Sequence, residues 1–269
     1  MGWTFTLLRA SLRVVGAHRR LLVFPIVSGV SIIALLAATV LPVWQLSLGG
    51  HGLRPISWLL MGAGYFLLSL VAIFCNSALV HAANLALRGG APTVAAGFRG
   101  AAGRFGPIVL WSLISCTVSL LLRALEVIKL GELIEAILGL AWQLTTYMVV
   151  PLIVVERDSV PGALRRSREM LRRTWGTNAS GSIGIAVWLL LIALIGVGAL
   201  IGVAALVNSV THDVNAAVLT AGIGIPVWLV LLILLGGTAS TLFRVALYRF
   251  AAEGTIVPQF RGLDLSSTF

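Results

Sequence analysis

The chain has 269 residues, of which 59% are hydrophobic and only 10% are charged. Soluble domains have roughly 45–50% apolar and about 25% charged residues, so a soluble fold could not hide this much apolar surface. The composition therefore predicts an integral membrane protein, and its net charge of +10 is attributed to membrane topology and not to nucleic-acid binding.

Six apolar runs are predicted to be transmembrane helices, for which about 20 residues cross roughly 30 Å of hydrocarbon. In chain order they cover about 21–45, 58–80, 107–122, 133–155, 183–207 and 218–243. Trp44 and Trp58 flank the first short loop, as aromatic residues do at a membrane interface. The chain is thus predicted to be an all-α polytopic protein with one membrane domain, residues 1–269.

Three basic segments also carry an apolar stripe at helical spacing. Within residues 1–20 the stripe is Phe5, Leu8, Leu12 and Val15. Within residues 92–106 it is Val94, Phe98, Ala101 and Phe105. The third segment follows Ser159, the predicted N-cap, with Pro161 in the first turn. Such segments are typical of interfacial amphipathic helices; the alternative is that their apolar faces cover one end of the bundle.

The basic residues predict the orientation of the spans. Sixteen of the nineteen lie in the N-terminal segment, in the loops at 81–106 and 156–180, and in the tail, whereas the alternate loops hold only Arg54, Arg123 and Lys129. Cytoplasmic loops carry the Lys/Arg excess. We therefore expect six spans with both termini in the cytoplasm.

The most basic loop is the predicted contact surface. Its candidates for binding anionic lipid headgroups or a partner protein are Arg165, Arg166, Arg168, Arg172, Arg173 and Trp175. Each arginine near an anionic membrane contributes about 1 kcal/mol. The alternative is that these arginines only follow the general rule for cytoplasmic loops.

The order of basic helix, span, outer turn and span occurs three times. Aligning Ser11, Gly97 and Ser167 places Arg19, Phe105 and Trp175 eight positions later, each just before a span. The match is one of pattern more than of identity. A threefold repeat of helical hairpins is therefore one interpretation, and an absence of repeats is the other.

No catalytic or cofactor motif stands out in the chain. It has no H-E-x-x-H, P-loop, dinucleotide fingerprint or G-x-S-x-G elbow, and Cys75 and Cys116 both lie within apolar runs. We therefore expect no cofactor, no metal and no enzymatic activity. A membrane enzyme would have to use the outer glutamates with two histidines, namely Glu126, Glu132, Glu135, His51 and His212.

The predicted spans contain mild polar residues and small residues. Asn76, Gln143 and Thr146 are candidates for a solute site, although hydrogen bonding between helices is the favoured interpretation. Gly198 and Gly202 have the small-xxx-small spacing of closely packed helices. We expect this pair to pack inside the bundle, with docking of a partner helix as the alternative.

Short motifs along the chain carry a family resemblance. They are W-T-F-T-L-L-R-A-S-L (3–12), L-L-V-F-P-I-V-S (21–28), F-C-N-S-A-L-V (74–80), P-L-I-V-V-E (151–156), A-L-R-R-S (163–167) and L-Y-R-F-A-A-E-G (247–254). The chain resembles the uncharacterised six-span prokaryotic membrane families known as domains of unknown function. The resemblance implies a prokaryotic inner-membrane protein, which we expect in the bacterial inner (plasma) membrane, and it assigns no residue a function.

These observations favour a non-catalytic accessory or scaffold subunit of a larger cell-envelope complex, with other membrane proteins and anionic lipids as partners. Lipid transport is the setting that we consider for such a complex. The alternative is a permease for a lipid or another apolar solute, which a cavity lined by Asn76, Gln143 and Thr146 would support.

Overall fold

The computed structural model of the protein describes residues 13–48, 55–127 and 132–253. Within these ranges the chain is helical and contains no strand. The elements are η1 (Arg19–Leu22), α2 (Val23–Leu48), α3 (Pro55–Leu87), α4 (Val94–Ala102), α5 (Phe105–Val127), α6 (Glu132–Thr146), α7 (Val149–Val154), α8 (Val160–Thr211) and α9 (Val214–Glu253).

Six segments of the described chain are long and apolar enough to cross a membrane. They are Arg19–Gln45, Pro55–Leu87, Phe105–Ala124, Ile137–Val154, Val187–Thr211 and Val214–Phe250. The predicted all-α architecture with six membrane-spanning helices is therefore confirmed.

Several boundaries differ from those expected from hydropathy, α3 for example ending at Leu87 and not near residue 80, and three differences bear on the site. The fourth span is interrupted at Tyr147 and Met148, between α6 and α7. The basic segment after Ser159 and the fifth span form one continuous helix, α8, because the glycines between them weaken a helix without stopping it. Helix α9 continues to Glu253 because its last turns are buried, so Arg244 lies in a helix and not in a polar tail.

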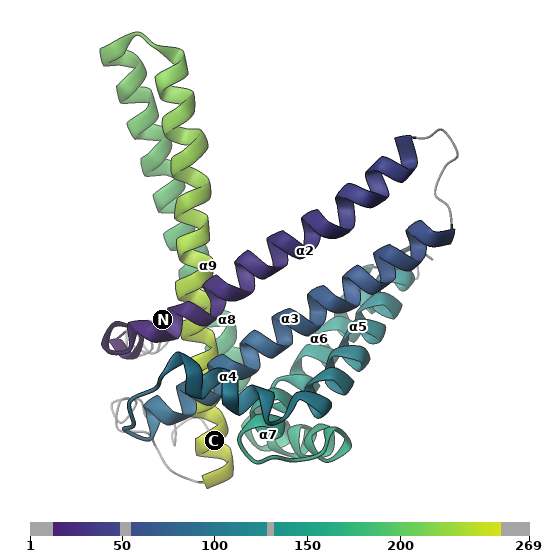
Figure 1. Cartoon of the computed structure of the whole chain (residues 1–269). Helices are drawn as coiled ribbons and strands as arrows, with labels where there is room; N and C mark the ends of the chain where they lie inside the picture. Colours follow the sequence, from purple (N-terminus) through teal and green to yellow (C-terminus); the bar gives the residue numbers. More distant parts are fainter. Residues whose placement is uncertain (1–12, 49–54, 128–131, 254–269) are drawn as a thin grey trace.

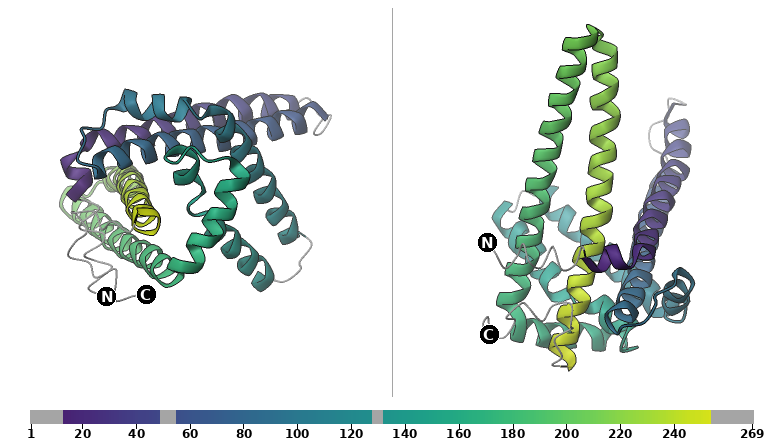
Figure 2. Two further views of the ribbon diagram at one scale, coloured as in Figure 1. Left: turned by 90° about the horizontal axis from the view of Figure 1, so that it is seen from below. Right: turned by 90° about the vertical axis from the view of Figure 1, so that its left-hand side faces the viewer.

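The helices form hairpins that diverge from a common end. In Figure 1 the α8–α9 hairpin rises as one long arm, whereas α2 and α3 run side by side in a different direction, with α5 beside α3 and α6 beside α5. The second view in Figure 2 shows the same separation of the α8–α9 arm. We call the common end the junction: η1, the C-terminal parts of α3 and α9, α4, α7 and the first turns of α8.

The buried core lies at this junction. Leu21, Ala83, Leu152 and Leu242 are fully buried there. Along the arms, by contrast, large apolar side chains are exposed, Ile195 at 71% among them. Lipid tails solvate such side chains as well as a protein interior does, so the arms need no further cover in a membrane.

The amphipathic segments pack their apolar faces onto the junction. In α4, Gly97 and Ala101 are buried, and the ring of Phe98 lies 5.1 Å from that of Phe24. In the first turns of α8, Ala163 and Met170 are buried in the same core. These faces therefore cover the end of the bundle, which is the second of the two interpretations of the sequence. Most of the first segment, residues 1–12, lies outside the described residues.

Candidate functional site

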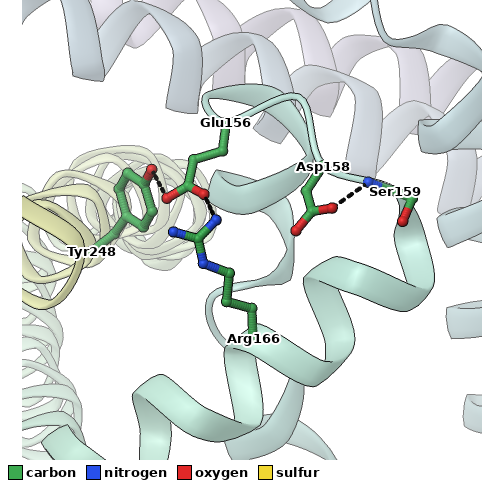
Figure 3. Close-up of polar contacts among 5 residues, drawn as sticks. All are labelled: Glu156, Asp158, Ser159, Arg166 and Tyr248. Carbon is green, nitrogen blue, oxygen red and sulfur yellow. Dashed lines mark hydrogen bonds and ion pairs between the residues drawn. The ribbon is translucent and has the colours of Figure 1, made fainter.

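Within the junction, a network of charged and polar side chains joins the start of α8 to the last turns of α9. Glu156, in the connection between α7 and α8, accepts a hydrogen bond from the hydroxyl of Tyr248 at 2.6 Å. The other oxygen of its carboxylate forms an ion pair with Arg166 of α8. Figure 3 shows Glu156 between these two side chains. The network therefore ties the first turns of α8 to the end of α9.

The start of α8 is capped as the sequence predicts. The hydroxyl of Ser159 accepts a hydrogen bond from the backbone N–H of Gly162 at 3.3 Å, and Pro161 lies in the first turn. The carboxylate of Asp158 accepts from the N–H of Ser159 at 2.7 Å (Figure 3). The hydroxyl of Ser159 pairs a backbone N–H at the start of α8, and the carboxylate of Asp158 complements the positive end of the helix dipole. Both side chains therefore stabilise the helix start.

Ser167 bridges the break in the fourth span. Its hydroxyl donates to the carbonyl of Thr145 at 2.6 Å and accepts from the N–H of Met148 at 3.3 Å. The side chain is fully buried. One residue of α8 thus satisfies two backbone groups that the break in the helix leaves free. Sequence analysis missed this role, and the only signal was a serine within an apolar stripe.

Two of the sixteen basic residues that predict the cytoplasmic side, Arg104 and Arg249, cap the ends of helices. The Nε of Arg104 donates to the carbonyl of Ile153 at 3.1 Å, at the end of α7. Arg249 donates to the carbonyl of Leu87 at 3.1 Å, at the end of α3. Cationic side chains bind the unpaired carbonyls of helix C-termini favourably. These two arginines therefore stabilise the junction.

The predicted contact arginines fall into three groups. Arg165 and Arg168 are exposed and form no hydrogen bond or ion pair within the described chain. Arg166 is paired with Glu156. The structure describes only the backbone, which is part of α8, for the remaining three residues, Arg172, Arg173 and Trp175.

A cavity lined by both polar and apolar residues lies between α2, α3 and α9. Its volume is 360 Å³. The polar side chains lining it are Ser28, Asn76, Ser240, Thr241 and Arg244. The hydroxyl of Thr241 donates to the carbonyl of Gly237 at 3.0 Å and lies 3.4 Å from the amide oxygen of Asn76.

The three predicted polar residues of the spans do not share this cavity. Asn76 lines it, whereas Gln143 is exposed on α6. The hydroxyl of Thr146 donates within its own helix, to the carbonyl of Trp142 at 2.8 Å. The structure therefore separates Asn76 from the other two candidates.

Like the hydroxyl residues of this cavity, Arg244 was not among the candidates predicted from the sequence, because it was assigned to the tail. Its guanidinium carbon lies 4.5 Å from the centroid of the Tyr147 ring. Its Nε is buried and has no hydrogen-bond partner. A partly buried cation without an ion-pair partner in the described chain therefore lines this cavity.

Gly198 and Gly202 do not pack within this chain. Both lie on an exposed face of α8, and a Cβ built at either position would meet no atom within 4 Å. The prediction that they pack inside the bundle is wrong for this chain. The close approach of α8 and α9 occurs instead at Gly196, where a Cβ would lie 2.1 Å from Nε1 of Trp228.

The residues proposed for an enzymatic site cannot be assembled from the described chain. His51 lies outside it, and so do the side chains of Glu126, Glu132 and Glu135. Among the described residues there is no group of three His, Cys, Asp or Glu side chains that could hold a metal ion.

Taken together, six apolar helices and a junction held by capped helix ends define a multi-pass α-helical membrane protein. Residues 56–257 match a family model described as "Family of unknown function (DUF6159)", and because this is more than half of the chain, the protein belongs to that family. The membership agrees with the resemblance seen in the sequence motifs. No curated protein and no solved structure matches this chain.

Proposed function

We propose that the protein is a non-catalytic scaffold, an accessory subunit of a larger complex in the bacterial plasma membrane. The observation that carries the proposal is the divergence of the α8–α9 arm from the other spans (Figures 1 and 2). A helix pair that leaves the bundle presents its faces to lipid or to the helices of another membrane protein.

The glycine face of α8 is the candidate docking surface for such a helix. Gly198 and Gly202 lie four residues apart, one turn of helix, with open space beside each. Small residues at this spacing let two helix backbones approach closely, which drives association in membranes where burial of apolar surface does not. Arg165 and Arg168, exposed at the start of the same helix, supply a second contact at the cytoplasmic face.

A permease for a lipid or another apolar solute is the second candidate. The cavity that contains Asn76 and Arg244 is the observation in its favour. Gln143 and Thr146 do not extend this cavity, so the predicted polar path across the spans does not form. The scaffold therefore remains the function we propose, within a complex that handles lipids.

The test is purification of the tagged chain in native-lipid particles with mass spectrometry of all co-purifying proteins. We expect a defined set of membrane proteins in fixed stoichiometry, and we expect Gly198→Leu combined with Gly202→Leu to reduce their recovery by at least about tenfold, the scale of a lost close helix contact. Gly62→Leu adds the same side chain on the other hairpin, where a Cβ also meets open space, and serves as the control.

Two results would count against the scaffold role. Recovery of the wild-type chain alone, with lipid only, would favour the permease. Equal recovery of partners with the double variant and with the Gly62→Leu control would remove the glycine face from the interface.

A further inference from the structure

We propose that the cavity between α2, α3 and α9 binds the phosphate headgroup of an anionic membrane lipid, with Arg244 as its cation. The inference does not rest on the proposed scaffold role. It follows from the unpaired charge of Arg244, from the polar lining of the cavity and from its depth along α9.

The charge of Arg244 is not compensated within the described chain. Among the described acidic side chains none forms an ion pair with Arg244, and Glu156 is already engaged by Tyr248 and Arg166. The contact with the ring of Tyr147 leaves the buried Nε–H without an acceptor. A buried donor on a cation is costly unless an acceptor, ideally an anion, reaches it.

The neighbouring side chains suit phosphate oxygens. Ser28 and Ser240 bring hydroxyl groups to the cavity from α2 and α9. The amide oxygen of Asn76 lies 3.4 Å from the hydroxyl of Thr241, and the amide N–H₂ of Asn76 donates to no group in the described chain, so it can donate to a ligand. A guanidinium with hydroxyl and amide donors around it is a common way to bind phosphate.

The position along α9 favours a lipid over a free ion. Arg244 lies about 45 Å along the helix from Val214, at 1.5 Å per residue, so it lies beyond the roughly 30 Å hydrocarbon layer that begins near the α8–α9 turn. Gly237 and Ala72 line the same cavity, and Gly237 lies about 10 Å deeper along α9. By the same measure Gly237 lies about 35 Å from Val214, so the cavity has its cation at headgroup depth and its floor at the inner edge of the headgroup layer, where the acyl chains begin.

The experiment uses the purified full-length protein in neutral detergent, with native mass spectrometry of bound phosphatidylglycerol and phosphatidylcholine. We expect the wild type to retain phosphatidylglycerol in preference, and Arg244→Gln to weaken this binding by at least about tenfold, the effect of losing a charge-assisted hydrogen bond. Arg123→Gln is the matched control, because Arg123 also lies over a tyrosine ring, that of Tyr65, but is exposed.

A second variant covers the case in which Arg244→Gln does not fold. Ser28→Leu fills the cavity from α2 and keeps Arg244, and it should weaken phosphatidylglycerol binding as well. Wild-type affinity for phosphatidylglycerol in both variants would overturn the proposal.

A third measurement separates the lipid from a free anion. Inorganic phosphate alone, added to lipid-free protein, should raise the melting temperature less than phosphatidylglycerol does. Equal stabilisation by phosphate, abolished by Arg244→Gln, would overturn the assignment to a lipid. Loss of lipid in these variants with partner proteins retained would leave the scaffold role intact.

Discussion

Single polar side chains complete the hydrogen bonding where helices of this protein break or end. Ser167 bonds both backbone groups across the gap between α6 and α7, and Arg104 binds the carbonyl at the end of α7. Glu156 joins α8 to α9 through Arg166 and Tyr248. Because buried backbone groups must be paired, these residues allow the chain to interrupt a helix inside an apolar core.

Ser167→Ala tests this role. The substitution leaves the carbonyl of Thr145 and the N–H of Met148 without their partner in a buried site, so we expect a loss of roughly 1–3 kcal/mol in the free energy of unfolding. Thermal unfolding followed by circular dichroism in one detergent measures the effect. Ser209→Ala is the control, since the hydroxyl of Ser209 donates to the carbonyl of Leu206 within the same exposed helix end. Equal melting temperatures for both variants would show that Ser167 does not hold the break.

At the scale of elements, close contact between helices depends on particular glycines. Gly97 places α4 directly against α3, whereas Gly198 and Gly202 of α8 face open space. Hydropathy and small-residue spacing could not distinguish these positions, since all are glycines in or beside apolar segments. A glycine that packs against a neighbouring helix differs from one that faces open space only in the direction in which it points. That direction is decided by tertiary packing.

Gly97→Ala should weaken the docking of α4. A Cβ at this position would lie 2.4 Å from Cζ of Phe24 and 2.9 Å from the backbone oxygen of Ala78. Because the backbone of α3 cannot move aside cheaply, we expect a loss of about 1–3 kcal/mol in unfolding free energy, as for other overpacked cores. Gly106→Ala, where a Cβ meets nothing within 4 Å, should be neutral or slightly stabilising through its higher helix propensity. A comparable loss in both variants would contradict the packing argument.

At the scale of the whole molecule, the junction gathers the core, the helix caps and the basic residues at one end. The diverging arms lie at the other end and expose their apolar faces. Burial in this fold is therefore concentrated at the junction, because the helix breaks and helix ends there need hydrogen-bond partners for their backbone groups. The arms require only a hydrocarbon environment and unbroken helical hydrogen bonding.

The orientation of the molecule is the prediction at this scale. In a background with Cys75→Ala and Cys116→Ala, a membrane-impermeant thiol reagent applied to intact spheroplasts should label Asp213→Cys and leave Ala91→Cys unlabelled. The reason is the sixteen-to-three distribution of basic residues toward the side of Ala91. Both positions are exposed in the structure, so accessibility is equal once the membrane is opened. Labelling of Ala91→Cys alone would reverse the topology.

The sequence by itself determined the class, the six spans and the N-cap of α8, because each depends on local composition or on residues a few positions apart. Within the contact surface predicted from the sequence, the structure shows that Arg165 and Arg168 are exposed, whereas Arg166 forms an ion pair with Glu156. Tertiary structure alone decided the break after Thr146, the role of Ser167 and the cavity at Arg244. The physical reason is that each joins residues far apart in the chain, as Asn76 and Thr241 are, and only packing brings such groups within hydrogen-bonding distance.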